Sequence, residues 1–240
     1  MNPDWKLIWN DEFDGDDVDL SKWNILDCPN GINNDLAYMA PHNVWLTDGC
    51  LVLRQQRENH KGFQYTSGKV NTLGKFSFMY GRVELRAKPP AGKGLHTALW
   101  TMLAGCTGTA TGNLNCQWPP EIDFIEVIGQ EPHIVHFNYH YGHPGHLGDG
   151  IWHTLDFNAT ADFHVYALEW EPTEIRWYMD GEEMFRTSKG VAEASLRNHI
   201  LILDTTVGGD WPGDPDETTT FPSFCLIDYV RVYQDANAKY

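Results

Sequence analysis

The stretch WPPEIDFIE, residues 118–126, places three carboxylates among aromatic, aliphatic and proline residues. Acidic side chains are rarely buried unless they are paired, so this pattern indicates a strand that faces a cleft. Successive side chains of a strand point to opposite faces, so Glu121 and Asp123 share one face while Glu126 falls on the other. A β-bulge near residues 124–125 would turn Glu126 onto the same face, and bulges are common beside active sites. The sequence therefore predicts three carboxylates on one surface.

A carboxylate cluster of this kind supports acid–base chemistry. Close like charges raise the pKa of one member, so that one carboxyl keeps its proton near neutral pH while a neighbour is ionised. For an acidic motif in isolation, the alternative is a solvated edge strand with fortuitous charges. Further motifs along the chain favour the catalytic interpretation.

The elements that must position these carboxylates are predicted to be strands. Short alternating segments bounded by Gly, Pro, Asn or Asp recur, and no segment has a sustained apolar period of 3.6 residues. This pattern predicts an all-β fold, a two-sheet antiparallel β-sandwich of jelly-roll type. We expect residues 1–240 to form a single domain, because we find no internal repeat or interdomain linker. The apolar parity changes at Gly81, which predicts a bulge or a strand that passes between the sheets.

Composition narrows the range of partners. The chain has 33 acidic and 17 basic residues and a net charge of −16, which disfavours nucleic acid and anionic membranes as partners. No apolar run approaches the roughly 20 residues that a membrane span needs. Ten Trp and ten Tyr exceed what packing usually demands, and exposed rings commonly stack on sugars or partners. The first residues lack a signal-peptide pattern, so we expect an intracellular protein or a mature domain whose leader has been removed.

The five cysteines are too few and too scattered for a disulfide framework. Cys106 and Cys116 bracket a loop rich in Gly, Thr and Asn just before the acidic stretch. Their spacing permits a disulfide, but a sequence does not give the Cα geometry that such a bond requires. A disulfide and two free thiols therefore both remain open.

Several ordered motifs spread along the chain accompany Glu-x-Asp-x-x-Glu at residues 121–126. They are residues 10–13 (NDEF), 65–72 (YTSGKVNT), 80–88 (YGRVELRAK), 208–213 (GGDWPG) and 228–233 (DYVRVY). With these motifs the chain resembles family 16 of the glycoside hydrolases, in its laminarinase-like branch, nearly from end to end.

The resemblance implies a curved jelly-roll with a sugar-binding cleft on its concave sheet. It also implies retaining hydrolysis, with Glu121 as the nucleophile, Glu126 as the general acid/base and Asp123 assisting the pair. A retaining hydrolase needs its two carboxyls about 5–5.5 Å apart. We expect an endo-acting β-1,3-glucanase, extracellular and monomeric, that cleaves laminarin-type glucan, accepts mixed β-1,3-1,4-glucan and uses no catalytic cofactor. The alternatives are a galactanase of the same fold, such as an agarase or carrageenase, and a non-catalytic glucan-recognition module.

The resemblance further implies six substrate contacts, which are Asn34, Lys69, His96, Trp100, Trp118 and His140. The chain departs from the family pattern at three positions: Lys69 stands where Arg is usual, His96 where Trp is usual and Asp35 where Glu is usual. An aromatic platform and a bidentate guanidinium are thereby lost. These departures bear on the substrate subclass more than on the type of reaction.

The resemblance also implies a structural calcium ion on the convex side, bound by Glu12, the carbonyl of Gly49 and Asp228, since oxygen ligands suit calcium. Asp228 has the strand parity of the apolar residues Phe224 and Leu226, so its carboxylate needs a partner. A salt bridge or a capped strand end is the alternative. A zinc site in the histidine-rich segment 133–146 is disfavoured, because no Cys or acid falls at a convincing ligand spacing.

Overall fold

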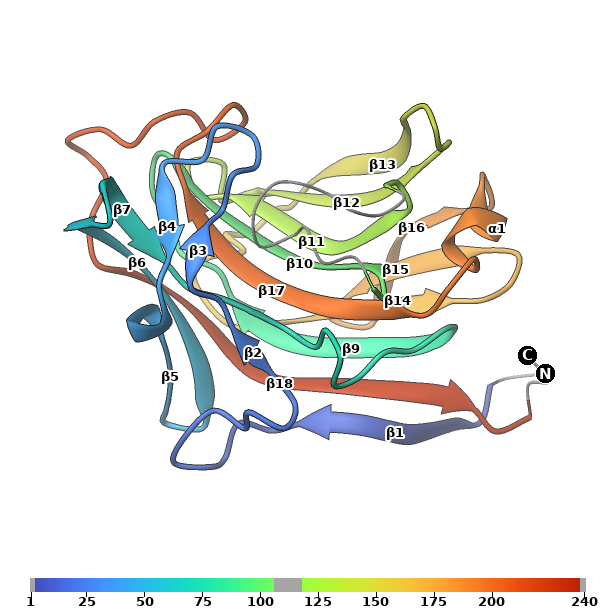
Figure 1. Cartoon of the computed structure of the whole chain (residues 1–240). Helices are drawn as coiled ribbons and strands as arrows, with labels where there is room; N and C mark the ends of the chain where they lie inside the picture. The colour runs from blue at the N-terminus through green and yellow to red at the C-terminus, as the bar shows by residue number, and fades with distance from the viewer. Residues whose placement is uncertain (1–2, 106–117, 238–240) are drawn as a thin grey trace.

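Two β-sheets stack on one another in the computed structural model, which describes residues 3–105 and 118–237 (Figure 1). The smaller sheet has seven strands in the order β13-β12-β11-β10-β17-β8-β2. Its strands are β2 (Asn24–Ile25), β8 (Lys69–Asn71), β10 (Leu95–Leu103), β11 (Glu121–Ile128), β12 (Ile134–Tyr141), β13 (Leu147–Thr154) and β17 (His199–Val207). Cys106 and Cys116, for which a disulfide was considered, lie outside the described residues.

The larger sheet has eleven strands and covers the other side of the core. Nine follow the order β16-β15-β14-β9-β18-β6-β7-β4-β3, while β1 pairs with β18 and β5 pairs with β6. Its strands are β1 (Trp5–Asp11), β3 (Cys28–Pro29), β4 (Ala37–Met39), β5 (Val44–Thr47), β6 (Cys50–His60), β7 (Phe63–Ser67), β9 (Gly81–Lys88), β14 (His164–Trp170), β15 (Ile175–Met179), β16 (Glu182–Thr187) and β18 (Ser223–Asp235). The helical elements described are the 3₁₀ turn η1 (Pro41–Asn43) and the single-turn α1 (Val191–Ala194).

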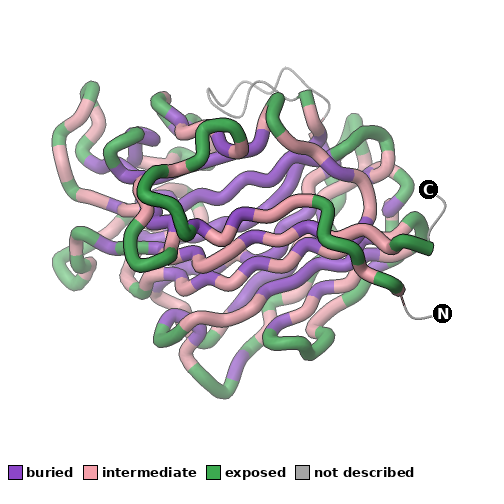
Figure 2. Tube along the Cα trace, turned by 90° about the horizontal axis from the view of Figure 1, so that it is seen from below, coloured by how far each residue is buried: buried purple, intermediate pink, exposed green. Residues whose placement is uncertain are grey.

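Strand pairing confirms the predicted antiparallel sandwich. Among the pairings described, only that of β4 with β7 is parallel. Burial alternates along β9, where Val83, Leu85 and Ala87 enter the core and the charged residues between them are partly exposed. Figure 2 shows the buried residues concentrated in the central strands and the exposed ones in the surrounding loops. The period of two thus places one face of each central strand in a core shared by both sheets.

The chain passes from one sheet to the other at Gly81, as the change of parity predicted. Phe78 forms an isolated bridge with His199 of the smaller sheet, whereas Gly81 pairs with Trp170 of the larger one. Gly81 has φ of 116°, and a Cβ there would lie 2.1 Å from the carbonyl oxygen of Tyr233. Only glycine fits this crossing.

One expectation of parity is wrong. The register of β18 shifts between Ile227 and Tyr229, so a bulge falls at Asp228. Before the bulge, Cys225 is fully buried while Phe224 is 40% exposed, which is the reverse of the predicted pattern. An extra residue in a strand reverses the facing of the residues on one side of it. The core face of β18 is therefore formed by Cys225 and Ile227 before the bulge and by Val230 and Val232 after it, while Phe224 lies outside the core.

No helix in the described part of the chain is long and apolar enough to cross a membrane.

Candidate active site

A bulge in β11 brings the three predicted carboxylates onto one face. The partners of Glu126, Asp123 and Glu121 on β10 are, in that order, Ala98, Trp100 and Met102. These partners are two residues apart, so all three carboxylates project from the same side of the sheet. The register shifts at Phe124, which confirms the bulge predicted near residues 124–125.

The bulge is tied to the opposite sheet by a hydrogen bond. The Trp177 indole on β15 donates from Nε1 to the backbone carbonyl oxygen of Asp123 at 2.7 Å. Pairing of β11 with β12 is interrupted between Asp123 and Glu126. Trp177 is completely buried, so its N–H compensates within the core for the interrupted pairing.

The carboxylates line a cavity of about 340 Å³ on the smaller sheet, within the size range of ligand pockets. Seven predicted site residues line it: Lys69, His96, Trp100, Trp118, Glu121, Asp123 and Glu126. One row of paired residues crosses the sheet from β8 to β13: Lys69, Asp204, Ala98, Glu126, His136 and Trp152. Each of the six strands thus contributes one residue to this row, and four of them, Lys69, Asp204, Ala98 and Glu126, line the cavity.

The neighbouring row contains Asp123, Asn138 and Gly150, from β11, β12 and β13. A Cβ at Gly150 would lie 2.1 Å from the Asn138 Oδ1 and 2.4 Å from the Phe137 carbonyl oxygen. Glycine therefore leaves room for the Asn138 amide against β13.

Glu121 and Asp123 share an imidazole as a neighbour, and Glu121 also contacts an indole. Trp118 donates from Nε1 to the Glu121 Oε2 at 3.1 Å. The His140 Nε2 lies 3.2 Å from the Asp123 Oδ2 and 3.8 Å from the Glu121 Oε1. His146 contacts the other nitrogen of His140 at 2.8 Å. His140 is not among the residues that line the cavity, yet it contacts two of the carboxylates, and its expected contact with the substrate stays a prediction.

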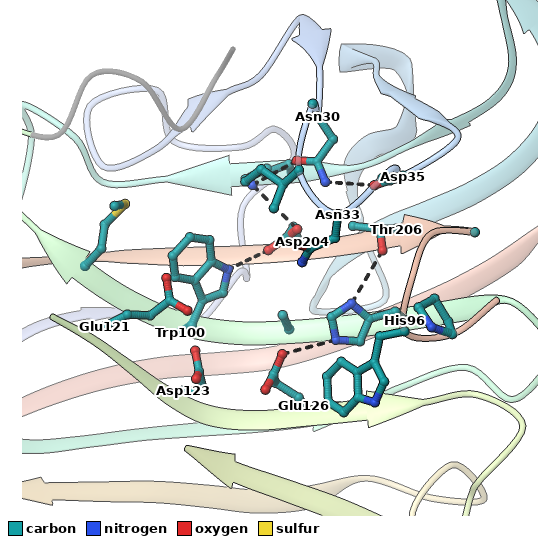
Figure 3. Close-up of a pocket in the computed structure, with 18 of the residues that line it drawn as sticks. Asn30, Asn33, Asp35, His96, Trp100, Glu121, Asp123, Glu126, Asp204 and Thr206 are labelled. Atoms are coloured by element: carbon teal, nitrogen blue, oxygen red, sulfur yellow. Dashed lines mark hydrogen bonds and ion pairs between the residues drawn. The ribbon is translucent and has the colours of Figure 1, made fainter. Parts of the chain in front are cut away.

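Glu126 has a different neighbour. The His96 Nε2 lies 3.3 Å from the Glu126 Oε1, and both side chains are about 85% buried. Figure 3 shows His96 between Glu126 and Thr206, on the opposite side of the acidic cluster from Glu121.

These surroundings separate the pKa values of the three acids. Burial and the charge of Asp123 raise the pKa of Glu121 to about 8. Burial and the charge of Glu126 also raise the pKa of Asp123, whose side chain is 3% exposed. Burial acts in the same direction on Glu126, but contact with His96 and the charge of that imidazole outweigh it and lower its pKa. In the free cleft at neutral pH, Glu121 therefore holds a proton and Glu126 is ionised.

The wall beside Trp100 is held by buried polar groups. The Trp100 Nε1 donates to the Asp204 Oδ1 at 2.7 Å, and the Lys69 Nζ lies 3.6 Å from the Asp204 Oδ2 (Figure 3). Lys69 also donates to the Asn30 Oδ1 at 3.3 Å, and Asn30 donates to Asp35 at 2.7 Å. Burial raises the pKa of Asp35 to about 7. This network fixes the indole at the edge of the cleft.

Asn34, the predicted cleft asparagine, does not line the cavity. Its side chain is exposed and donates to Asp210 at 2.8 Å, while Asn30 and Asn33 line the cavity instead. The sequence interpretation also missed Asp204, although a carboxylate at the end of the apolar run ILIL is a recognisable signal. Trp211, in the motif of residues 208–213, also lines the cavity beside His96.

The residues expected to bind calcium make other contacts. Arg231 binds Glu12 through two nitrogens, at 2.9 and 2.7 Å, and Asn10 donates to the same carboxylate. Arg86 binds Asp228 at 2.7 Å. In the described residues, the only group of three or more His, Cys, Asp or Glu side chains at metal-binding spacing is Glu121, Asp123 and His140. Both carboxylates of the expected calcium site are thus paired with arginine, the contact that the salt-bridge alternative describes, and the calcium ion stays a prediction.

Comparison with known proteins decides the family. The model of glycosyl hydrolases family 16 matches residues 35–231. The chain belongs to this family.

Two sequence relatives and one solved structure show which family 16 proteins this chain is similar to. It is 36% identical to a β-glucanase of Rhodothermus marinus over 97% of its length, and 32% identical to a keratan-sulfate endo-1,4-β-galactosidase of Sphingobacterium multivorum over 96%. The chain spans 86% of the length of the first protein and 56% of the second. It spans only 35% of a third relative, the clotting factor G alpha subunit of Tachypleus tridentatus. The laminarinase catalytic domain of Thermotoga petrophila is 36% identical and superposes with a TM-score of 0.83, over 98% of this chain and 100% of that domain. The protein is a glycoside hydrolase with the family's jelly-roll fold.

Proposed function

We propose that residues 1–240 act as one catalytic domain, a retaining endo-hydrolase of laminarin-type β-1,3-glucan that also accepts mixed β-1,3-1,4-glucan. The observation that carries this proposal is the alignment of Glu121, Asp123 and Glu126 on one face of the cavity, produced by the bulge in β11. The β-glucanase and laminarinase relatives support glucan as the substrate.

In the proposed reaction, the Glu121 carboxylate attacks the anomeric carbon while Glu126 protonates the leaving glycosidic oxygen. Water then hydrolyses the glycosyl-enzyme ester, with Glu126 taking the proton of that water. Asp123 lies between the two glutamates and assists the pair, and the His140 Nε2 lies 3.8 Å from the Glu121 carboxylate that forms as its proton leaves.

This reaction needs the proton on Glu126, whereas the free cleft holds it on Glu121. The acids are close enough to titrate together, so the number of protons on the cluster matters more than their resting positions. Moving one proton from Glu121 to Glu126 leaves the charge of the cluster unchanged. We therefore expect substrate binding to redistribute a proton that the cluster already holds.

The direct test is release of reducing ends from laminarin and barley β-glucan by the wild type and by the Glu121→Gln and Glu126→Gln variants. Wild-type rates in both variants would contradict the assignment. Trapping with a 2-fluoro glycoside and peptide mass spectrometry identifies the nucleophile. Attachment to Glu126 instead of Glu121 would reverse the two proposed roles.

A galactan is the second candidate substrate. The keratan-sulfate galactosidase relative and the replacement of an aromatic platform by His96 favour it, while the net charge of −16 opposes sulfated polymers. Adding agarose, carrageenan and keratan sulfate to the assay separates the two candidates. A non-catalytic glucan-binding role is disfavoured because both glutamates are present, and saturable binding without new reducing ends would support it.

We also propose that the protein acts as an extracellular monomer, because a polysaccharide does not cross a membrane and an endo-hydrolase must meet it outside the cell. A calcium ion at Glu12, Gly49 and Asp228 stays a prediction. Binding it would require Glu12 to leave Arg231 and Asp228 to leave Arg86. Size-exclusion chromatography and calcium titration test these two points.

A further inference from the structure

His96 is held on three sides at the edge of the acidic cluster. Its Nε2 lies 3.3 Å from the Glu126 Oε1, and its Nδ1 lies 3.5 Å from the Thr206 Oγ1 (Figure 3). The Trp211 ring meets the imidazole edge-on, with the ring centroids 5.2 Å apart. The side chain is 15% exposed, so its contact with Glu126 is largely shielded from solvent.

Charged groups on the surrounding elements favour the imidazolium form. Glu126 on β11, Asp204 on β17 and Asp35 before β4 all act on His96. Burial lowers the pKa of His96, but contact with Glu126 and these negative charges outweigh burial and raise it above its ordinary value. His136 on β12 does not compete, because burial lowers its pKa to about 4 and leaves it neutral.

We propose that His96 is a positioning residue that shares the catalytic proton with Glu126. The inference rests on the proposed role of Glu126 as general acid. As substrate binds, Glu121 gives up its proton to the pair formed by the Glu126 Oε1 and the His96 Nε2, and Glu126 passes one proton of the pair to the leaving glycosidic oxygen as the C–O bond breaks. When water later attacks the glycosyl-enzyme, its proton returns to the pair through Glu126, and Glu121 takes a proton back from the pair once the ester is cleaved. No proton is gained or lost over the cycle except from that water.

This arrangement has a consequence for the pH profile. The proton affinity of a pair of basic sites exceeds that of either site alone, because the two association constants add. The pair therefore keeps its last proton to a higher pH than Glu126 alone would. The alkaline limb of kcat/KM reports the loss of this proton in the free enzyme.

The first test compares pH profiles of kcat/KM on laminarin for the wild type and His96→Gln. Gln has a similar size and still donates a hydrogen bond to Glu126, but it cannot hold the proton. We expect the alkaline limb to move to lower pH by at least about half a unit. His136→Gln is the matched control, because a neutral imidazole contributes no proton and the limb should stay in place. An unchanged limb in His96→Gln would overturn the proposal.

The second test varies the leaving group. Loss of general acid catalysis costs about 10²–10⁴-fold, but only where the leaving oxygen needs a proton. We expect His96→Gln to lose about 10- to 100-fold in kcat on laminarin and less than about threefold on a dinitrophenyl glycoside. Equal losses on both substrates would mean a merely structural role. His96→Ala repeats the comparison with a side chain that cannot clash.

Glu126→Gln separates this inference from the proposed function. If Glu126→Gln is selective for activated leaving groups and His96→Gln is not, only the role of His96 is refuted. If Glu126→Gln itself lacks this selectivity, Glu126 is not the general acid and the proposed function fails with it.

Discussion

Replacing Trp177 by Phe tests whether the larger sheet holds the catalytic bulge in place. The substitution removes the indole N–H that binds the Asp123 carbonyl oxygen at 2.7 Å. A buried acceptor that loses its partner costs about 1–3 kcal/mol. It also frees the backbone of the residue between the two catalytic glutamates, so we expect a loss of both stability and kcat.

Trp170→Phe is the matched control. Trp170 and Trp177 are both completely buried, but the Trp170 Nε1 has no hydrogen-bond partner among the described residues. The two variants lose similar ring volume, so the difference between them isolates the hydrogen bond. For a protein of this size, 1 kcal/mol shifts Tm by about 2–4 °C. We therefore expect Trp177→Phe to melt about 2–12 °C below Trp170→Phe.

Catalysis should separate the two variants further. Misplacement of catalytic groups by about 1 Å can cost 10²-fold in rate. We expect Trp177→Phe to lose at least about tenfold in kcat on laminarin with a smaller change in KM, and Trp170→Phe to stay near the wild type. Calorimetry and initial rates check both expectations. Equal Tm and equal kcat in the two variants would refute the link between the sheets.

Three further predictions concern buried charges and the calcium ion. Folding raises the pKa of Glu121 to about 8, so the folded state binds more protons than the unfolded state between about pH 4.5 and 8, and stability falls as pH rises through this window. Glu121→Gln should flatten this part of the Tm profile, and a slope equal to that of the wild type would contradict the prediction. Asp204→Asn leaves the buried Lys69 cation without its carboxylate, and we expect a loss of about 3–5 kcal/mol in urea unfolding. A stability within 1 kcal/mol of the wild type would count against this ion pair. If calcium binds at Glu12 and Asp228, EDTA lowers Tm and calcium restores it, whereas Glu12→Gln abolishes the response.

The sequence predicts the regular parts of this fold because the period of two is visible in the residues. Parity alone placed Glu126 on the wrong side of β11, and this conflict is what revealed the bulge. The same reasoning failed in β18, because no functional motif indicated that a second bulge lies at Asp228. A bulge can be predicted where its absence would separate residues that must act together.

Loop residues and cross-strand partners are less accessible to sequence. Asn34 was chosen over its neighbours by motif, but residues 33 and 34 both have positive φ and no strand period applies to them. His96 was placed in the cleft correctly, whereas its contact with Glu126 depends on the register of β10 against β11. That register depends on how the strands pair across the sheet, and the strand pairing cannot be read from the sequence.

Gly150 sets a limit on how readily the substrate preference of this enzyme could be redesigned. Any side chain at this position would meet a backbone carbonyl as well as the Asn138 amide, so the local strand would have to move. In a library of variants selected for activity on new polysaccharides, those substituted at Gly150 would therefore misfold. Trp152, two residues further along β13, is 63% exposed and borders His136 and Trp211. Diversity introduced there would sample new sugar contacts while leaving the strand intact.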